Sequence, residues 1–379
     1  MSLSLTLQGA EVLRPEGWSD APLGISGGVI VEADGRAVDL SGYRVLPGIV
    51  DLHGDGFERH VAPRRGALRE TRGGLIATEA ELAANGITTA WLAQFWSWEG
   101  GLRGPEFAEA IFTAWGEMRG SVATDLRVQL RLETHMVDDF HRVAETVARH
   151  GIGYLVFNDH LQHGRLAEGR RPKQMTGQAL KSGRSPEAHF EYMLALHGRG
   201  PEVPEACAAL AARLAERGVA LGSHDDSTAE GRGGWRGIGA RIAEFPETLE
   251  AAEAARAGGD GIVMGAPNVV RGASHKGNVR ALELIEAGLC DALASDYHYP
   301  APLSAVRRIA ELGVLDLAEA WRHVSEGPAR VMGLTDRGRI EEGRRADLVI
   351  LDGEGRVAAT LAGGRVTYMS GAVAERFIR

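Results

Sequence analysis

The sequence predicts an α/β protein in which a (β/α)8 TIM barrel is joined to a small β-domain. Two patterns support this prediction. In the middle of the chain, eight apolar, strand-like runs alternate with stretches rich in Ala, Leu and Glu at helical spacing. At both chain ends, short alternating strands with Gly and Asp turns replace this pattern. Eight strand–helix units in about 290 residues match the usual size of a (β/α)8 barrel.

The two chain ends are predicted to form the small domain together. Residues 1–45 contain short alternating runs, for example 28–35, and little helical periodicity. Residues 338–379 have the same character, with a turn and a buried strand in 339–352 and another strand at 363–368. We therefore expect a β-domain of residues 1–45 and 338–379, and a barrel of residues 46–337.

The barrel strands are predicted in chain order. We expect them at residues 48–55, 87–94, 126–134, 153–160, 219–225, 242–245, 261–266 and 291–296. Helical patterns between them include residues 75–85, 205–217, 246–257 and 278–287. Residues 161–204 are the exception, because this stretch is long, basic, rich in Gly and Pro, and only weakly periodic. We expect it to be an enlarged loop between a strand and a helix, over the active face.

Composition and charge exclude several classes of protein. The net charge of -9 shows no excess of basic residues that would attract nucleic acid or an anionic membrane, so the expected partners are small molecules. Cys207 and Cys290 are too few for a disulfide framework or a thiolate metal site. No apolar run approaches the roughly 20 residues that span a bilayer, and the first residues do not resemble a signal peptide. We expect a soluble, cytoplasmic protein that forms a homo-oligomer whose subunit number the sequence leaves open.

Polar residues gather where the predicted strands end, and active sites of such barrels lie at the C-terminal strand ends. These residues are His53 and Asp55 in the first strand, Glu133 in the third, Asp159 and His160 in the fourth, Ser223, His224, Asp225 and Asp226 in the fifth, Glu244 in the sixth, and Ser295, Asp296 and Tyr297 in the eighth. In the third strand, residues 127, 129, 131 and 133 form a polar face that should look into the barrel.

A divalent metal ion fits such a set, because it needs three or more converging imidazole and carboxylate groups and then activates water. Some of these residues also have a structural interpretation. His160 could be a hydrogen-bonding rim residue, and Glu133 a salt-bridge partner of an arginine inside the barrel. Glu244 could cap the helix that follows Pro246. His135, on the same strand face as Glu133, is a weaker candidate ligand.

Two segments resemble the amidohydrolase superfamily: Leu-Pro-Gly-Ile-Val-Asp-Leu-His at 46–53 and Gly-Arg-Arg-Ala-Asp-Leu-Val-Ile at 343–350. The resemblance implies a metal-bearing barrel beside a β-sandwich made from both chain ends. Further motifs, at 53–55 with 63–64 and at 222–228, 243–248, 264–275 and 293–297, look like the PhnM branch of this superfamily. That branch belongs to the carbon-phosphorus lyase pathway of phosphonate use. Its members hydrolyse α-D-ribose 1-methylphosphonate 5-triphosphate to the 5-phosphate and diphosphate.

The resemblance implies a metal site and a catalytic residue. The implied metal-site residues are His53, Asp55, Glu133, His160, His224 and Asp296, with Glu244 as a further candidate. Asp55 stands where most of the superfamily has a second His, and Asp296 would be the general base that takes a proton from the attacking water. We expect one or two divalent ions, zinc first, with manganese and iron left open.

Basic residues after the strands are candidates for binding substrate phosphates. Arg271, His275 and Lys276 lie in a Gly-rich loop after the seventh strand, where barrels often bind phosphate, although a solvated basic loop is the plain alternative. Arg59 and Arg64 follow the first metal motif and are further candidates. Asp225 and Asp226 are also assigned to the substrate site, because their motif is specific to the branch.

Two departures separate this chain from the branch. After Asp-His the branch usually continues with a Ser/Thr-Pro-Gly-Gln-like stretch, whereas this chain has Leu-Gln-His-Gly at 161–164. The second departure is that the rest of the loop, to about Pro204, also differs. Loops in that position commonly decide the substrate.

The leading hypothesis is a diphosphatase in which metal-bound hydroxide attacks the α-phosphorus of a ribose 5-triphosphate. An amidase or deaminase of a small cyclic amide or amine is the alternative, and a non-enzymatic scaffold subunit is the third hypothesis.

Overall fold

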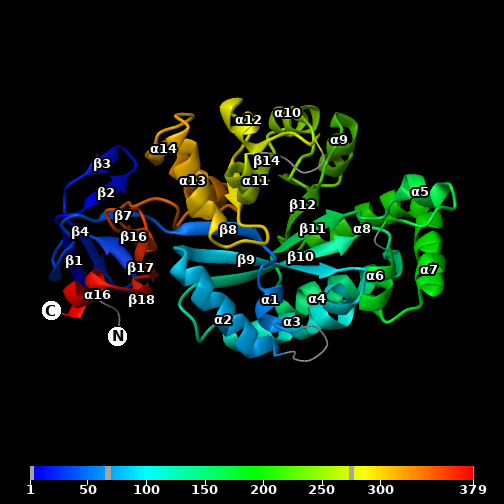
Figure 1. Cartoon of the computed structure of the whole chain (residues 1–379), viewed down its shortest axis with the longest axis horizontal. Helices are drawn as coiled ribbons and strands as arrows, with labels where there is room; N and C mark the ends of the chain where they lie inside the picture. Colours follow the sequence, from blue (N-terminus) through cyan, green and yellow to red (C-terminus); the bar gives the residue numbers. More distant parts are fainter. Residues whose placement is uncertain (1–3, 65–69, 174, 273–276, 379) are drawn as a thin grey trace. The chain divides into compact units, whose positions relative to one another are not determined.

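The barrel strands form one sheet in chain order, from β8 to β15 (Figure 1). The computed structural model describes residues 4–64, 70–173, 175–272 and 277–378. The strands are β8 (Ile49–Gly54), β9 (Ile87–Trp96), β10 (Asp125–Glu133), β11 (Tyr154–Asn158), β12 (Ala220–His224), β13 (Ile242–Glu244), β14 (Gly261–Gly265) and β15 (Ala292–Ala294). A parallel bridge between Gly54 and Asp296 joins the first strand to the last. The eight parallel strands thus form a nearly closed barrel, which confirms the predicted fold class.

Helices alternate with these strands. They are α1 (Glu58–Val61), α2 (Thr71–Ala84), α3 (Pro105–Met118), α4 (Phe140–His150), α8 (Val203–Ala215), α9 (Ala229–Gly237), α10 (Leu249–Ala257), α11 (Ala266–Arg271), α12 (Ala281–Glu286), α13 (Ala301–Glu311), α14 (Leu317–Arg322) and α15 (Glu326–Val331), with short 3-10 turns at η1 (Gly101–Arg103) and η2 (Val137–Asp139). The four predicted helical stretches correspond to α2, α8, α10 and α12. The side chain of Thr248 caps α10 by accepting from the Ala251 amide, so the cap of this helix is not Glu244.

The long connection between β11 and α8 is the enlarged connection between a strand and a helix that the sequence predicts, and it contains helices that the sequence did not predict. It holds α5 (His163–Ala167), α6 (Met175–Ser182), α7 (Pro186–Gly198) and the 3-10 turn η3 (Gly200–Glu202). Ser185 caps α7 by accepting from the Ala188 amide, and Pro186 occupies its first turn. Because α5 and α6 are short, the first part of the segment has little helical periodicity in the sequence.

Strands from both chain ends share one sheet, as predicted (Figure 1). β7 (Arg44–Pro47) pairs antiparallel with β16 (Leu348–Leu351). The six-stranded sheet, ordered β18-β17-β16-β7-β2-β3, also contains β2 (Glu11–Arg14), β3 (Gly17–Ser19), β17 (Val357–Ala362) and β18 (Arg365–Met369). The four-stranded sheet, ordered β5-β4-β1-β6, contains β1 (Leu5–Gln8), β4 (Leu23–Ser26), β5 (Val29–Val31) and β6 (Arg36–Asp39). Leu7, Val45 and Ile350 belong to one buried core beside the terminal helix α16 (Ala372–Ile378). The limits of this domain at residues 45 and 338 stay a prediction.

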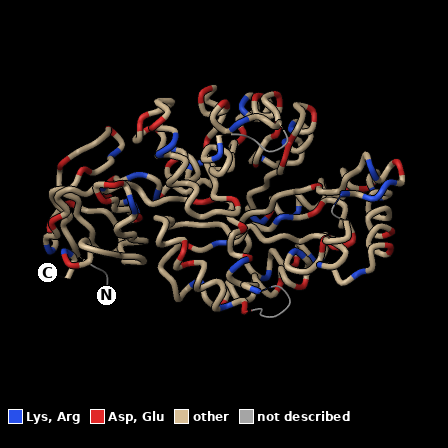
Figure 2. The backbone as a smooth tube through the Cα atoms, in the orientation of Figure 1, with Lys and Arg blue, Asp and Glu red and all other residues tan. Residues whose placement is uncertain are grey.

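The chain divides into two compact units. Unit 1 comprises residues 1–92, 118–127 and 262–379, and holds the terminal strands with β8, most of β14, and β15. Unit 2 comprises residues 93–117 and 128–261, and holds most of β10 with β11, β12, β13 and residues 161–204. Basic and acidic residues are interspersed in both units (Figure 2). Within the described ranges, no helix is both long and apolar enough to cross a membrane.

Candidate metal centre

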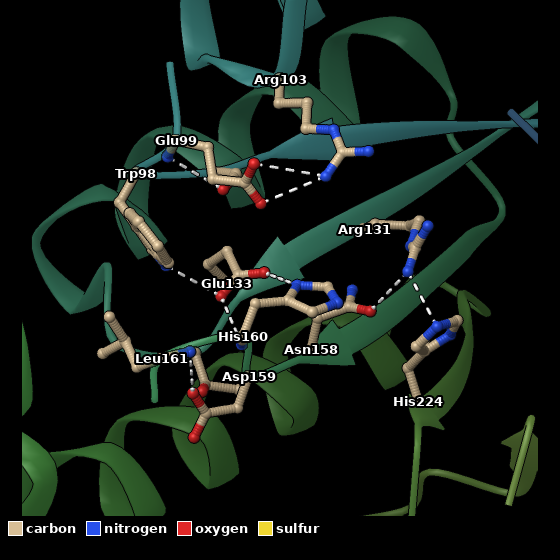
Figure 3. A network of polar contacts seen from close by, with 12 residues as sticks. Trp98, Glu99, Arg103, Arg131, Glu133, Asn158, Asp159, His160, Leu161 and His224 are labelled. Carbon is tan, nitrogen blue, oxygen red and sulfur yellow. Dashed lines mark hydrogen bonds and ion pairs between the residues drawn. The ribbon is translucent and has the colours of Figure 1, made fainter. Parts of the chain in front are cut away.

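In unit 2, one face of β10 carries a row of buried polar side chains. Gln129, Arg131 and Glu133 are all almost completely inaccessible to solvent, and they alternate with the buried leucines of the same strand. Successive side chains of a strand point to opposite faces, so these three residues share one face, as the sequence pattern predicts. Gln129 donates to Glu244 of β13, Arg131 donates to Asn158 of β11, and Glu133 contacts His160, which follows β11. Figure 3 shows the contacts of Arg131 and Glu133.

Glu133 forms the centre of this cluster (Figure 3). Its Oε1 lies 2.5 Å from Nδ1 of His160, and its Oε2 accepts from the His160 backbone amide at 3.1 Å and from Nε1 of Trp98 at 3.1 Å. Burial alone raises the pKa of Glu133, but the charge and hydrogen bonds of His160 outweigh burial and lower it. Conversely, burial lowers the pKa of His160, and the Glu133 carboxylate more than offsets this. The two residues are therefore a carboxylate–imidazole pair.

His224, at the end of β12, is held in one tautomer. Its Nε2 lies 2.9 Å from Nη2 of Arg131, and its Nδ1 lies 3.3 Å from Oε2 of Glu244. Arginine can only donate, so Nε2 is an acceptor and Nδ1–H donates to Glu244. Glu244 is completely buried and also accepts from Gln129 and from the Tyr154 hydroxyl. His224 is thus neutral, the form in which a histidine binds a metal ion, and in this structure its Nε2 lone pair accepts from Arg131.

His160, His224 and Asp225 could hold a metal ion together. Each presents one ligand atom, and these atoms lie within 4.8 Å of one another. Asp225 follows β12 with a φ of 61°, a left-handed conformation that aspartate tolerates better than most residues. Two imidazoles and a carboxylate are a donor set that suits zinc, manganese or iron. The sequence pointed to the two histidines, but it placed Asp225 in the substrate site.

Asp226 occupies a different environment. Its Oδ2 accepts from Oγ of Ser223 at 2.6 Å and from Nη1 of Arg232 at 3.0 Å. The Arg232 side chain is completely buried and also pairs with Asp260. Burial raises the pKa of Asp226, and the contacts with Ser223 and Arg232 only partly offset this effect. The structure thus places Asp226 in a buried ion-pair network, and its assignment to the substrate site stays a prediction.

In unit 1, the backbones of the first and last barrel strands bring three predicted site residues together. The Asp296 amide donates to the His53 carbonyl at 2.8 Å, and the Asp55 amide donates to the Asp296 carbonyl at 2.9 Å. Asp296 has a φ of 57° directly after β15. The His53 side chain is fully buried, whereas Asp55 and Asp296 are partly exposed. Backbone pairing therefore fixes the neighbourhood of Asp55 and Asp296.

Asp51 is a buried acid at this end of the sheet that sequence reasoning missed. Its carboxylate accepts from the Ser295 backbone amide at 2.9 Å and from the Ser295 hydroxyl at 2.5 Å. Burial raises the pKa of Asp51, and the hydrogen bonds from Ser295 only reduce this effect. The spacing of Asp51 two residues before His53 was the available signal, because both lie on the same face of β8.

The predicted phosphate ligands are only partly brought together. Arg59 Nη1 donates to the Tyr297 carbonyl at 3.2 Å and also pairs with Glu81. The Arg271 guanidinium lies 6.0 Å from the centre of the Tyr297 ring, so both arginines lie near the residue that follows Asp296. Arg64 is exposed. His275 and Lys276 lie outside the described residues. His135, the weaker candidate ligand, lies near Asp159 and His163 instead of the centre described above.

Comparison with known proteins gives one relative over most of the chain. The α-D-ribose 1-methylphosphonate 5-triphosphate diphosphatase of Escherichia coli (strain K12) is 34% identical over 323 residues, which cover 83% of this chain and 85% of that relative. An adenine deaminase of Methylobacterium nodulans is 50% identical, but over only 62 residues, 16% of this chain and 11% of that relative.

The fold and the family are supported by two further comparisons. A mutant N-acetyl-D-glucosamine-6-phosphate deacetylase of Mycobacterium smegmatis has a TM-score of 0.65 and 15% identity, and the match covers 97% of this chain and 100% of that structure. At this identity the likeness concerns the fold alone. The model of the amidohydrolase family matches residues 57–373, and the E. coli relative extends over most of the same region. The chain therefore belongs to the amidohydrolase family and is a hydrolase of that superfamily.

Proposed function

We propose that the protein is a metal-dependent diphosphatase. Its substrate is a ribose 5-triphosphate, α-D-ribose 1-methylphosphonate 5-triphosphate or a close analogue, and its products are the 5-phosphate and diphosphate. The observation that carries the proposal is the 34% identity, over 83% of the chain, to an E. coli enzyme with this named activity. Phosphonate metabolism is the corresponding physiological role.

The donor set of unit 2 fits a divalent ion. His224 offers an Nε2 lone pair, His160 and Asp225 offer atoms within 4.8 Å, and Glu133 adds a buried negative charge beside His160. In this proposal, His53, Asp55 and Asp296 of unit 1 are also metal-site residues, as the family resemblance implies, and zinc is the leading ion. Glu244 is an orienting residue, because its carboxylate accepts from His224, Gln129 and Tyr154. A bound ion supplies Lewis acidity, which activates water and offsets negative charge on the phosphoryl oxygens.

The residues of unit 1 supply the proton transfer and the substrate contacts. Asp296 accepts the proton of the attacking water at its carboxylate, and backbone bonds with His53 and Asp55 hold its position. Arg59 and Arg271, which lie near Tyr297, bind the phosphate groups that leave as diphosphate. Both guanidinium groups offset charge that develops on the leaving group.

Product analysis tests the proposal. Metal-loaded protein is incubated with a panel of ribose and nucleoside 5-triphosphates in water labelled with oxygen-18, and the products are identified by phosphorus NMR and mass spectrometry. We expect diphosphate and the labelled 5-phosphate in equal amounts, because water attacks the α-phosphorus, and we expect a chelator to stop the reaction. Release of single phosphates, or label in the diphosphate only, would contradict the proposal.

A deaminase is the second candidate function, because one short segment is 50% identical to an adenine deaminase. The same preparation is therefore assayed for ammonia release from adenine and from small cyclic amides. Ammonia without any phosphorus product would favour this second function. Stoichiometric metal with activity on either panel would exclude the non-enzymatic scaffold hypothesis.

A further inference from the structure

A second cluster of candidate metal-binding side chains lies in unit 2, where β10 and β11 end and α5 begins. It consists of His135, which follows β10, Asp159, which follows β11, and His163, the first residue of α5. Each presents one ligand atom, and the three atoms lie within 4.8 Å of one another. None of these residues belongs to the group of His160, His224 and Asp225.

The distances in this cluster suit one shared ion. Asp159 Oδ2 lies 2.8 Å from Nε2 of His163 and 3.7 Å from Nδ1 of His135. Two ligands of a tetrahedral zinc ion lie about 3.4 Å apart, because each is about 2.1 Å from the metal. The observed distances lie on either side of this value. Small side-chain rotations would therefore place the three atoms around one ion.

His197, near the end of α7, supports the ligand geometry of His163. Its Nδ1 lies 2.8 Å from Nδ1 of His163, and the two rings are 5.0 Å apart. A histidine that binds a metal through Nε2 carries its proton on Nδ1 and usually donates it to a neighbour. His197 Nδ1 is such an acceptor, and this hydrogen bond would fix the orientation of the His163 ring.

We propose that His135, Asp159 and His163 bind a second divalent transition-metal ion, zinc in the first instance, with His197 as the orienting residue. Two imidazoles and one carboxylate supply three ligands, and water completes the coordination. The ion would join the ends of β10 and β11 to α5, the first helix of residues 161–204. It would therefore have a structural role, which is to fasten residues 161–204 to the barrel strands.

Metal analysis of three single variants tests the proposal. The metal content of the full-length protein is measured by mass spectrometry after equilibration with zinc and removal of free ion. We expect His163→Asn to hold one equivalent less than the wild type. The control is His141→Asn on α4, because His141 is exposed and lies 3.7 Å from Glu145, and its metal content should not change. His224→Asn should lose barrel metal but keep the equivalent that depends on His163.

Limited proteolysis gives a readout that is independent of activity. Arg170 is exposed within the segment and is a trypsin site. With free zinc at 100 times its Kd, cleavage of the wild type should slow by up to about 100-fold, because bound ion depletes the open state by that factor. His163→Asn should be cleaved at the fast rate with or without zinc. Equal metal content in the wild type and His163→Asn would overturn the proposal, as would zinc protection that persists in the variant.

Discussion

The acidic residues at the two ends of strand β10 have different kinds of partner. At its start, Asp125 accepts from Arg127 at 2.8 Å and from Arg337 at 2.6 Å. At its end, Glu133 contacts the His160 imidazole and the Trp98 indole. One acid is thus neutralised by two permanent cations. The other is beside a histidine whose charge can change and whose ring can bind a metal.

Strand β15 repeats the contrast. Asp291, just before the strand, accepts from the Ile262 amide at 2.9 Å and from Arg330 at 2.7 Å. Asp296, just after it, is held by its backbone, and its side chain remains partly exposed. In these two strands, the acid at the start pairs with arginine, whereas Glu133 at the end of β10 contacts a histidine and Asp296 after β15 is partly exposed. This division is the one expected for a (β/α)8 barrel.

The largest expected effect separates the two acids of β15. Asp296→Asn should lower kcat for diphosphate release by about 10²–10⁴-fold, because the amide cannot accept the proton of the attacking water. Stability should be unchanged, since asparagine also tolerates the left-handed backbone of this position. Steady-state kinetics on metal-loaded protein and urea unfolding measure the two quantities.

The matched control is Asp291→Asn, which should give the opposite result. It should keep kcat and lose about 1.5–3 kcal/mol of stability, the usual value of hydrogen bonds to a charged group. If Asp296→Asn were merely unstable and Asp291→Asn were inactive, the division between strand starts and strand ends would be wrong.

Asp226 tests an exception to this division, because it follows β12 and yet pairs with a buried arginine. Arg232→Met should cost about 3–5 kcal/mol in the free energy of unfolding, since it leaves the buried Asp226 carboxylate without its charge partner. Arg241→Met is the control, because Arg241 contacts the same Asp260 but is half exposed, and it should cost at most about 1 kcal/mol. Equal losses in urea unfolding would show that burial of the pair is unimportant.

Glu244 tests whether an acid at a strand end can act on the metal through another residue. Glu244→Gln should weaken metal affinity by about 10–100-fold, because the carboxylate that receives Nδ1–H of His224 loses its charge. Competition with a chromophoric chelator measures this affinity, and excess metal should restore most of kcat. Glu253→Gln, on the exposed face of α10, is the control and should bind metal like the wild type. Unchanged affinity in Glu244→Gln would mean that His224 needs no orienting partner.

The fold could be predicted from the sequence because each barrel strand is a short apolar run followed by polar residues. The order of the eight strands, the meeting of the two chain ends and the four predicted helical stretches all follow from local patterns. Residues 161–204 were different, because α5 and α6 are too short for an apolar periodicity to develop.

For the candidate site, the alternation of side chains along the strand predicted that Gln129, Arg131 and Glu133 share one face of β10. The side chains that contact each site residue could not be predicted. In the turn after β12, Asp225 lies near His160 and His224, whereas Asp226 pairs with Arg232. This difference depends on the backbone of the turn, in which φ is positive at Asp225. The cluster of His135, Asp159 and His163 depends on two segments that are distant in the sequence, the turn after β10 and the connection after β11. Such contacts follow from packing rather than from any local pattern.

The smallest expected effect concerns acid stability at the start of β10. Burial raises the pKa of Asp125, but Arg127 and Arg337 outweigh burial and lower it below its ordinary value of 3.8. A lowered pKa means that the ion pairs stabilise the fold above pH 3.8 and that this contribution is lost as pH falls through the lower folded value. Asp125→Asn should therefore cost about 1–2 kcal/mol at neutral pH, and the unfolding curves of variant and wild type should converge in acid. Arg337→Met should show the same convergence, because it removes a cation from the same pair. A difference between wild type and Asp125→Asn that stays constant down to the acid limit would mean that the two arginines do not stabilise the start of this strand through its charge.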